Sequence, residues 1–430
     1  MTGNRTPSLA AAILLTGAAA MGQSGGALAS VDELVRIAVE RNRDFLALRQ
    51  RLAEAQALLR QAGVRPTPTL EVEGGTGRPL GTVGEAEYSA GYFHPIETFG
   101  KRDKRIRVVQ KSVELAEAEI SERRRQLAFE IESRYADALA QQRTIDALDR
   151  LITVQRESYR LTEVRARAGD AAALEAQLLS TEMNRAEAQK AIASGRLASL
   201  LLELRQFAGL TTGDPLTVGD RLAPTPSDYE LTQLQQRAAQ VRPDLRIARL
   251  LEQQAEAETD LAEAQARPDL TLSARYSRKY AQFDQFGLNA SGSTVPLRDR
   301  DNVVTFGVAI PLLTRRRNQG NIEAARSRFE VARLRYQHLE ATIPLEVEAA
   351  FRRWSAAKRY LDILDSGVIQ QSERNLAVIR QAYELGQLRI LDVLNEQRRL
   401  IETQLAYIDA QAGQFRAMAE LAKAVGGEIR

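Results

Sequence analysis

The sequence predicts a mainly helical protein with a small β part, built as two copies of one structural plan. Three observations support this fold class: an internal repeat, long helical stretches with a seven-residue apolar period, and four short segments of alternating polarity. Each copy is expected to contain one helix, two strands and a long helical hairpin. The elements are justified below in chain order.

Residues 1–29 are expected to be a secretory signal peptide. Arg5 supplies a small positive region, residues 9–21 are apolar, and Ala27-Leu28-Ala29 places small residues before the expected cleavage site. The apolar run is too short for a membrane span of about 20 residues. The chain is therefore expected to be exported.

Composition limits the chemistry that the chain can perform. There is no cysteine, which excludes disulfides, thiolate metal sites and a lipid-modified N-terminal cysteine. The formal net charge is +3 and the two signs are interleaved, so no nucleic-acid surface is indicated. His94 and His338 are the only histidines. No ligand cluster, phosphate loop or catalytic constellation stands out, so we expect no metal site, no cofactor and no enzyme.

The repeat is carried by residue types that rarely match by chance. Pro68 recurs as Pro268, Pro95 as Pro311 and Gly169 as Gly386, at separations that grow along the chain. Six further residues recur at the separation of 200 seen for Pro68, namely Leu34, Ala38, Asp44, Ala55, Ala62 and Leu70. The expected division is a first repeat over 30–207, a linker over 208–229, a second repeat over 230–424 and a tail over 425–430.

The helices are expected over 31–63 and 230–266, with very long ones over 101–165 and 317–382 and returning helices to about 207 and 424. A helix of about 65 residues is on the order of 100 Å long, so these helices must pack side by side. Apolar residues recur every seven positions, which indicates coiled-coil-like packing. They are Ile131, Ala138, Ile145, Ile152 and Tyr159 in the first repeat, and Val347, Trp354, Leu361 and Val368 in the second.

Strands are expected over 69–74, 86–94, 269–277 and 303–310, with a Gly/Ser-rich loop inside each pair. Each has one apolar face and one polar face, a pattern shared by soluble sheets and by membrane barrels. Export and the concentration of aromatic residues here favour the membrane. The expected lipid-facing residues are Leu70, Val72, Tyr88, Tyr92, Leu270, Leu272, Tyr276, Val304, Phe306 and Val308.

Four strands cannot close a membrane barrel, because the smallest such barrels need about eight. Open strand edges are costly in lipid, so a membrane sheet requires partner chains. Three chains would supply twelve strands. The expected helix–strand junctions lie at prolines that stop a helix and let the chain change geometry. These prolines are Pro68, Pro95, Pro268 and Pro311.

These features together resemble the TolC family of outer-membrane efflux channels, over essentially the whole mature chain. Two stretches resemble the strand-to-helix junctions of the CzcC-type branch, which serves heavy-metal pumps of the resistance-nodulation-division class. They are PIETFGKR over 95–102 and PLLTRRRNQGNI over 311–322. The resemblance implies a homotrimer with a twelve-stranded β-barrel in the outer membrane and a long α-helical barrel in the periplasm.

The resemblance also implies two further kinds of site. The helix-turn tips would dock a periplasmic adaptor protein, through Gly169 and Leu174 in one hairpin and Gly386 and Leu391 in the other. A periplasmic gate would involve Tyr383, Asp392 and Asn395. The gate departs from the family pattern, because Asn395 stands where some members have aspartate and Leu388 where some have arginine.

The function expected from this resemblance is passive conduction of cargo that an inner-membrane pump exports through an adaptor. Heavy-metal cations are one candidate cargo; drugs and polypeptides are others. Two alternatives remain open from the sequence. The chain could be a periplasmic adaptor, although adaptors usually carry one hairpin between β-rich domains. It could also be a soluble coiled-coil scaffold, which leaves the alternating strands unexplained.

Overall fold

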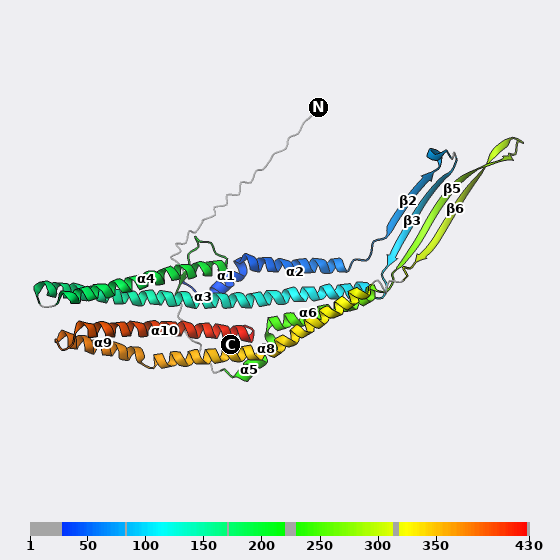
Figure 1. Cartoon of the computed structure of the whole chain (residues 1–430). Helices are drawn as coiled ribbons and strands as arrows, with labels where there is room; N and C mark the ends of the chain where they lie inside the picture. The colour runs from blue at the N-terminus through cyan, green and yellow to red at the C-terminus, as the bar shows by residue number, and fades with distance from the viewer. Residues whose placement is uncertain (1–27, 82–83, 170–171, 220–228, 313–317, 428–430) are drawn as a thin grey trace, which may run out of the picture.

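The computed structural model describes residues 28–81, 84–169, 172–219, 229–312 and 318–427. It is a long helical rod with a four-stranded sheet at one end (Figure 1). The turns of both helical hairpins lie at the opposite end of the rod (Figure 1). Parts of the predicted signal peptide, linker, second junction stretch and tail fall outside the described residues, namely 1–27, 220–228, 313–317 and 428–430.

The first repeat contains a broken helix, a strand pair and a hairpin of two long helices. Its elements are α1 (Val31–Arg41), α2 (Arg43–Ala62), β2 (Thr69–Thr76), the short 3-10 helix η1 (Arg78–Leu80), β3 (Ala86–Ile96), α3 (Lys101–Ala168) and α4 (Ala173–Ala208). Two short strands, β1 (Leu28–Ala29) and β4 (Thr217–Val218), pair in parallel beside it. Cleavage after Ala29 would remove β1, and that cleavage stays a prediction.

The second repeat follows the same order with different boundaries. Its elements are α5 (Leu231–Val241), α6 (Pro243–Gln265), β5 (Leu270–Leu288), β6 (Thr294–Ala309), α8 (Gln319–Asp365), α9 (Val368–Glu384) and α10 (Ile390–Val425). The strands of both repeats join one antiparallel sheet in the order β2-β3-β5-β6. The sheet therefore unites the two repeats at one end of the rod.

The helix α3 is the structural axis of the rod. Its 68 residues correspond to about 100 Å at 1.5 Å per residue, and it packs against α2, α4, α6 and α10. The largest apolar cluster gathers around its middle, where Tyr135 is fully buried against α1, α4 and the segment containing β4. Leu216 and Val218, within the predicted linker, belong to this cluster. This part of the linker is packed core.

The prediction of single helices over 31–63 and 230–266 is wrong, because both are broken at equivalent positions. Asn42 separates α1 from α2 and starts the new helix, since its side chain accepts a hydrogen bond from the Phe45 amide at 3.0 Å. Arg242 separates α5 from α6, and Pro243 follows at the first helical position, where its missing N–H costs nothing.

The two breaks make equivalent contacts with the ends of the returning helices. Asn42 donates from Nδ2 to the Phe207 carbonyl at 2.9 Å, near the C-terminus of α4. Arg242 donates to the Ala424 carbonyl at 3.3 Å, near the C-terminus of α10. Asn42 and Arg242 have the same separation in sequence as Pro68 and Pro268, and Phe207 and Ala424 have the same separation as Gly169 and Gly386. Each break thus anchors the returning helix of its own repeat.

The second long helix also differs from the prediction. It breaks at Ser366 and Gly367, where Gly367 has φ +113°, whereas α3 continues without interruption at the corresponding level. Val368, expected in the buried apolar stripe, is 38% exposed because it begins a new helix. The buried members of that stripe are Val347, Trp354 and Leu361.

The second strand pair is much longer than the prediction. The polar segment between 277 and 303 was expected to be a loop, yet β5 and β6 continue through it to a turn at Asn289–Ser293. Consecutive charged residues occupy both faces of the strands here, so the segment lacks the alternation of apolar and polar residues that predicts a strand. The β5–β6 hairpin therefore extends beyond β2 and β3, as Figure 1 shows.

Candidate functional site

The register of the sheet collects all ten expected lipid-facing residues on one face. Leu70 lies opposite Tyr92, Val72 opposite Ala90, Tyr92 opposite Ala274, and Phe306 opposite Ala274 from the other side. Side chains alternate between faces along each strand, so these pairings place the apolar residues together. The face is open in the single chain, with Phe306 79% exposed and Val72 76% exposed. We call it the outward face.

The opposite face, called the inward face, is polar and contains ion pairs. Arg275 on β5 lies 2.6 Å from Glu73 and 3.3 Å from Glu71, both on β2, and so spans the intervening strand β3. Lys279 lies 3.3 Å from Glu87. Sequence reasoning placed Glu71, Glu73, Glu87 and Arg275 on polar strand faces, and it left Lys279 in the expected loop. Their pairing required the register, which joins residues about 200 positions apart.

The sheet leaves both edge strands without partners within the described chain. Those edges are β2 and β6. An edge strand presents unpaired N–H and C=O groups, which is unfavourable in lipid. A second chain could satisfy the β6 edge by adding its own β2, and so on around a closed ring.

The four junction prolines lie where strands meet helices or loops. Pro68 and Pro268 come just before β2 and β5, and Pro311 follows β6. Pro95 lies inside β3, one residue from its end, and pairs with Thr271. The pairing of β2 with β3 ends at Phe93, so Pro95 has a neighbouring strand, β5, on one side only. A proline, which lacks the backbone N–H, is tolerated at such an edge position.

A polar clasp joins the start of α3 to the start of β5. Lys101 is buried and donates from Nζ to the Arg267 carbonyl at 2.7 Å, with the Asp269 carboxylate at 2.8 Å. The Thr98 hydroxyl donates to the Pro268 carbonyl at 2.6 Å. These contacts explain part of the stretch 95–102, because its polar residues hold the strand-to-helix turn.

The tips of the two hairpins are closed by glycines in the left-handed conformation. Gly169 has φ +88° at the end of α3, and Gly386 has φ +74° after α9. Leu174 and Leu391 begin the returning helices and are 62% and 48% exposed. The docking role of these four residues stays a prediction.

The three predicted gate residues are not brought together within one chain. The Tyr383 hydroxyl donates to the Glu175 carboxylate on α4 at 2.9 Å, which joins the two tips. Burial and this carboxylate raise the pKa of Tyr383. Asp392 instead caps α10, accepting from the Arg389 amide at 3.0 Å, and Asn395 is exposed. Glu175 was missed, since sequence shows it only as an acidic residue in a first helical turn.

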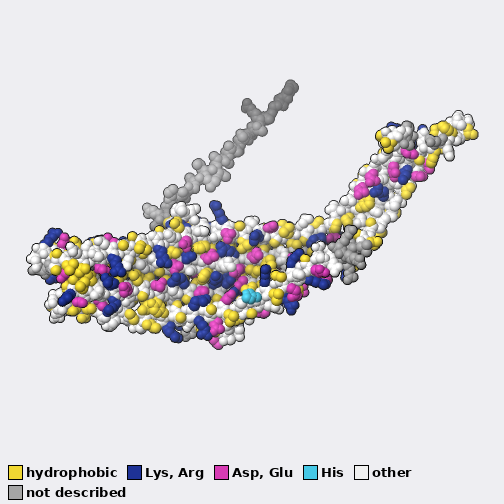
Figure 2. All heavy atoms as spheres, in the orientation of Figure 1, with side chains coloured by type: hydrophobic (Ala, Val, Ile, Leu, Met, Phe, Trp, Pro, Cys, Tyr) yellow, Lys and Arg dark blue, Asp and Glu magenta, His cyan; other side chains and the backbone are white. Residues whose placement is uncertain are grey.

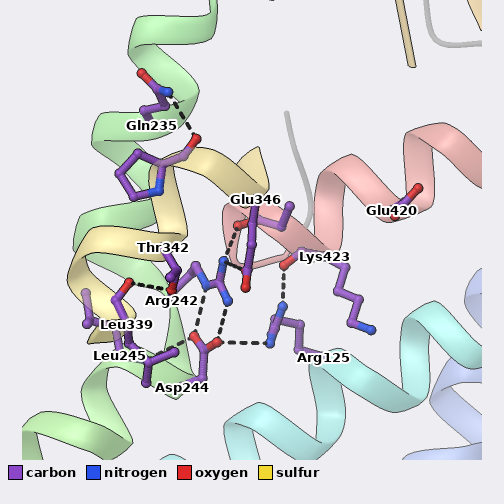
Figure 3. A network of polar contacts seen from close by, with 12 residues as sticks. Arg125, Gln235, Arg242, Asp244, Leu245, Leu339, Thr342, Glu346, Glu420 and Lys423 are labelled. Atoms are coloured by element: carbon purple, nitrogen blue, oxygen red, sulfur yellow. Dashed lines mark hydrogen bonds and ion pairs between the residues drawn. The ribbon is translucent and has the colours of Figure 1, made fainter. Parts of the chain in front are cut away.

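A network around two buried arginines joins the break between α5 and α6 to α8, α10 and α3 (Figure 3). The Arg242 side chain is 5% exposed and lies between Asp244 and Glu346, with Nε 2.9 Å from Asp244 and a terminal nitrogen 2.7 Å from Glu346. Arg125 approaches Asp244 from α3 at 3.8 Å and donates to the Lys423 carbonyl. Both arginines therefore meet the C-terminal carbonyls of α10, where positive charge is favourable.

The network shifts the titration of its members in opposite directions. Burial acts to raise the pKa of Asp244, but the hydrogen bonds and charge of Arg242, with help from Arg125, outweigh it and hold that pKa below its usual value. Burial acts to lower the pKa of Arg242, but Asp244 and Glu346 outweigh it and raise that pKa. Both groups are therefore charged at neutral pH.

The surface of the rod carries mixed charge and no concentrated ligand cluster. Figure 2 shows acidic and basic side chains interspersed along the helices. Among the described residues, no group of three or more His, Cys, Asp or Glu side chains is placed to hold a metal ion. None of the described helices combines the length and the apolar character needed to cross a membrane.

This architecture defines a class of protein: a two-repeat helical rod ending in an incomplete sheet with an apolar outward face. The chain belongs to the outer membrane efflux protein family, whose sequence model matches residues 34–210 and 234–427. This confirms the family expected from the sequence. Its place is accordingly the outer membrane of a Gram-negative bacterium.

Individual relatives are distant but extend over nearly the whole chain. The cobalt-zinc-cadmium resistance protein CzcC of Cupriavidus metallidurans is 22% identical over 92% of this chain and 90% of its own length. The toluene efflux pump outer membrane protein TtgI of Pseudomonas putida is 24% identical over 92% and 84%.

Solved structures of similar fold include CusC, with a TM-score of 0.73, 19% identity and coverage of 93% and 92%. The open state of the MtrE outer membrane channel of Neisseria gonorrhoeae has a TM-score of 0.72, 19% identity and coverage of 92% and 89%. At these identities the likeness concerns the fold.

Proposed function

We propose that three copies of the chain form the exit duct of a tripartite efflux system, conducting cargo passively across the periplasm and outer membrane. The observation that carries this proposal is the sheet: four strands, an apolar outward face, a charged inward face and two open edges. Three such sheets would make a twelve-stranded barrel without free edges. A helical rod of about 100 Å below it would serve as the periplasmic duct.

The barrel is tested by charge placed on adjacent residues of one strand. Val304 faces outward and Val303 inward, as their partners Tyr276 and Ser277 indicate. Arginine at a lipid-facing position near the bilayer midplane costs about 2–4 kcal/mol, whereas lumen positions tolerate it. Val304→Arg should therefore reduce outer-membrane assembly, while the matched control Val303→Arg should assemble normally. Equal assembly of both variants would contradict the assigned faces.

The trimer is tested through the absence of natural cysteines. One cysteine at Val72 on β2, combined in turn with single cysteines at 302–308 on β6, should yield disulfide-linked trimers for the positions that face each other between chains. Native mass spectrometry of the unmodified chain should give three times the subunit mass. A monomer in mild detergent and no linked product at any position would contradict the proposed closure.

We also propose that the hairpin tips dock a periplasmic adaptor, which couples the duct to an inner-membrane pump of the resistance-nodulation-division class. Exposed apolar side chains at both tips support this, including Leu174 and Leu391. Tyr383, Asp392 and Asn395 would line the gate between copies. The double variant Leu174→Asp/Leu391→Asp should lose adaptor binding and retain its trimer. Ile192→Asp, on an exposed site farther along α4, should bind the adaptor normally.

For cargo, we propose cations of the heavy-metal type named for CzcC. The described inward face of the sheet carries more carboxylates than cationic groups: Glu71, Glu73, Glu87, Asp299 and Asp301 against Arg275 and Lys279. Diffuse negative charge favours cations without holding them tightly. Expression in strains lacking either CzcC or TtgI tests this, because restored metal resistance without restored solvent tolerance is expected. The reverse result would contradict the cation proposal.

A further inference from the structure

Three arginines lie together on the outward face of the sheet, beyond the apolar residues. Arg278 is on β5, and Arg298 and Arg300 are on β6. The register pairs Arg278 with Asn302, Tyr280 with Arg300 and Gln282 with Arg298. All three arginines share the strand parity of Tyr276 and Val304, so they continue the face that carries the apolar residues.

Two of the arginines, Arg278 and Arg300, stack on one tyrosine, Tyr280, which also contacts Tyr88. The Tyr280 ring centre lies 4.9 Å from the guanidinium carbon of Arg278 and 5.6 Å from that of Arg300. Tyr88 meets Tyr280 edge to face, with centroids 6.4 Å apart. A guanidinium stacked on a ring keeps its planar fork of N–H donors for a second partner. Such tyrosines are typical of the girdle at a membrane interface.

No acidic group neutralises these arginines in the part of the chain that the structure describes. Its ion pairs include Arg275 and Lys279 on the inward face, but none of the three outward arginines. The Nε atom of Arg278 is buried and donates to no acceptor among the described atoms.

A neighbouring chain in the proposed ring would not supply the missing acid. The strand that would meet β6 is β2, and its residues on the outward face carry no carboxylate. They are Leu70, Val72, Gly74 and Thr76. Closure of the barrel therefore brings no carboxylate from the described outward residues of β2 to the three arginines.

The position of the cluster along the strand matches one bilayer thickness. A transmembrane β-strand needs about 9–11 residues, and Tyr280 lies about ten residues beyond Leu270, where β5 leaves the helical end. The arginines thus lie at the membrane surface opposite the rod. In the orientation of the proposed function, on which this step rests, that surface is the outer leaflet.

We propose that Arg278, Arg298 and Arg300 form an outward site that binds the phosphate groups of the glycolipid headgroups in the outer leaflet. Arginine matches phosphate because its planar fork donates parallel, charge-assisted hydrogen bonds. The apolar face below the site continues directly from it and would contact the acyl chains of the same lipid. The occupant is thus an amphiphile with an anionic head, and the two parts of the surface lie in the order that a membrane lipid requires.

The test uses the purified full-length trimer in dodecyl maltoside, with diphosphoryl lipid A as the probe and retained lipid measured by native mass spectrometry. Wild type should retain lipid A, and the double variant Arg278→Gln/Arg300→Gln should bind it about tenfold or more weakly, since hydrogen bonds to charged groups are lost. The matched control Lys279→Gln removes a charge from the inward face and should bind like wild type.

Further arms separate the possible outcomes. Arg278→Lys keeps the charge without the planar fork and should bind lipid A more weakly than wild type. This single variant still tests the site if the double variant fails to assemble. Equal lipid binding by wild type and the double variant would overturn the site. Equal protection against thermal unfolding by inorganic phosphate and by lipid A would overturn the lipid assignment. The trimer mass recorded in the same spectra tests the proposed function separately.

Discussion

The two repeats fix the same inter-helix contact with different side chains. In the first, the neutral amide of Asn42 caps α2 and donates to Phe207 near the end of α4. In the second, Arg242 occupies the equivalent position, donates to Ala424 near the end of α10 and is embedded between Asp244 and Glu346.

Both repeats therefore keep a hydrogen bond from the helix break to a carbonyl near the end of the returning helix, but they make it with different side chains. A neutral cap satisfies a few polar groups at low desolvation cost. A buried arginine must be paired, since an uncompensated buried charge is strongly destabilising. In the second repeat, Glu346 of α8 and Arg125 of α3 therefore take part in the contact. We expect the contact of the second repeat to be more easily disrupted by mutation than that of the first.

The largest expected effect comes from Arg242→Ala. Removing this side chain leaves Asp244 partly buried with Arg125 as its remaining cation, so the free energy of unfolding should fall by about 3–4 kcal/mol. Asn42→Ala removes a cap and one hydrogen bond and should cost about 1–2 kcal/mol. Denaturant unfolding of the detergent-solubilised protein measures both.

The control for this pair is Arg246→Ala, which removes an exposed arginine one turn along α6. It should change the free energy of unfolding by about 0.5 kcal/mol or less. If Asn42→Ala proves as costly as Arg242→Ala, the proposed difference between the two contacts is wrong.

The next pair of substitutions should destabilise the first repeat more than the second. Gly209 and Gly426 end α4 and α10 with positive φ, at +69° and +110°. A Cβ on Gly209 would lie 2.6 Å from the Arg41 backbone, whereas one on Gly426 would first meet a methyl group of Val241 at 3.0 Å. Gly209→Ala should therefore cost about 2–3 kcal/mol and Gly426→Ala about 1–2 kcal/mol. Equal thermal shifts would show that the Arg41 backbone yields as readily as the Val241 side chain.

A pH dependence should distinguish the charged contact from the neutral one. The folded pKa of Asp244 is lowered, so its contribution is present above the ordinary aspartate value of about 4 and is lost as pH falls through the folded pKa. Asp244→Asn should destabilise by about 1.5 kcal/mol at pH 7, and this difference from wild type should shrink below pH 4. Asn42→Ala should show no such shrinkage, because an amide does not titrate. Parallel unfolding curves at pH 7 and pH 3.5 provide the comparison.

The smallest expected effect tests the break that only the second repeat has. Gly367→Ala places a side chain at φ +113° in open space, so only backbone strain of about 1 kcal/mol is expected. Hydrogen exchange should rise around Ser366 and leave α3 unchanged. Slower exchange across the break would mean that the substitution joins α8 to α9 into one helix like α3.

Sequence periodicity was sufficient for the plan of the molecule. The period of seven predicted α3, the period of two predicted four strands, and Gly169 and Gly386 marked two turns that the structure places at one end of the rod. These signals are local, because an element's own residues carry the pattern of the face it buries. The ten outward residues were identifiable for the same reason, since alternation alone assigns the face.

Tertiary structure decided what depends on partners distant in sequence. The prediction continued one helix through Asn42 and another through Arg242, although Pro243 is a local signal for the second break. The contacts of Asn42 and Arg242 with the ends of α4 and α10 are visible only in the structure. Charged residues between 277 and 303 suggested a loop because their strand partners could not be seen. The partners of Tyr383 and Arg275 lie about 200 residues away, and no local pattern encodes such pairs.

The sequence by itself thus determined the repeat, the element types and the faces, because periodicity is a property of each segment. Only the tertiary structure decided which contacts the helix breaks make, how far the β5–β6 hairpin extends and which charges are paired. Those features depend on desolvation and on contacts between segments, which no single segment contains. The outward arginines show this most clearly: their residue type is visible in the sequence, but their lack of acidic partners among the described residues emerges only from the register.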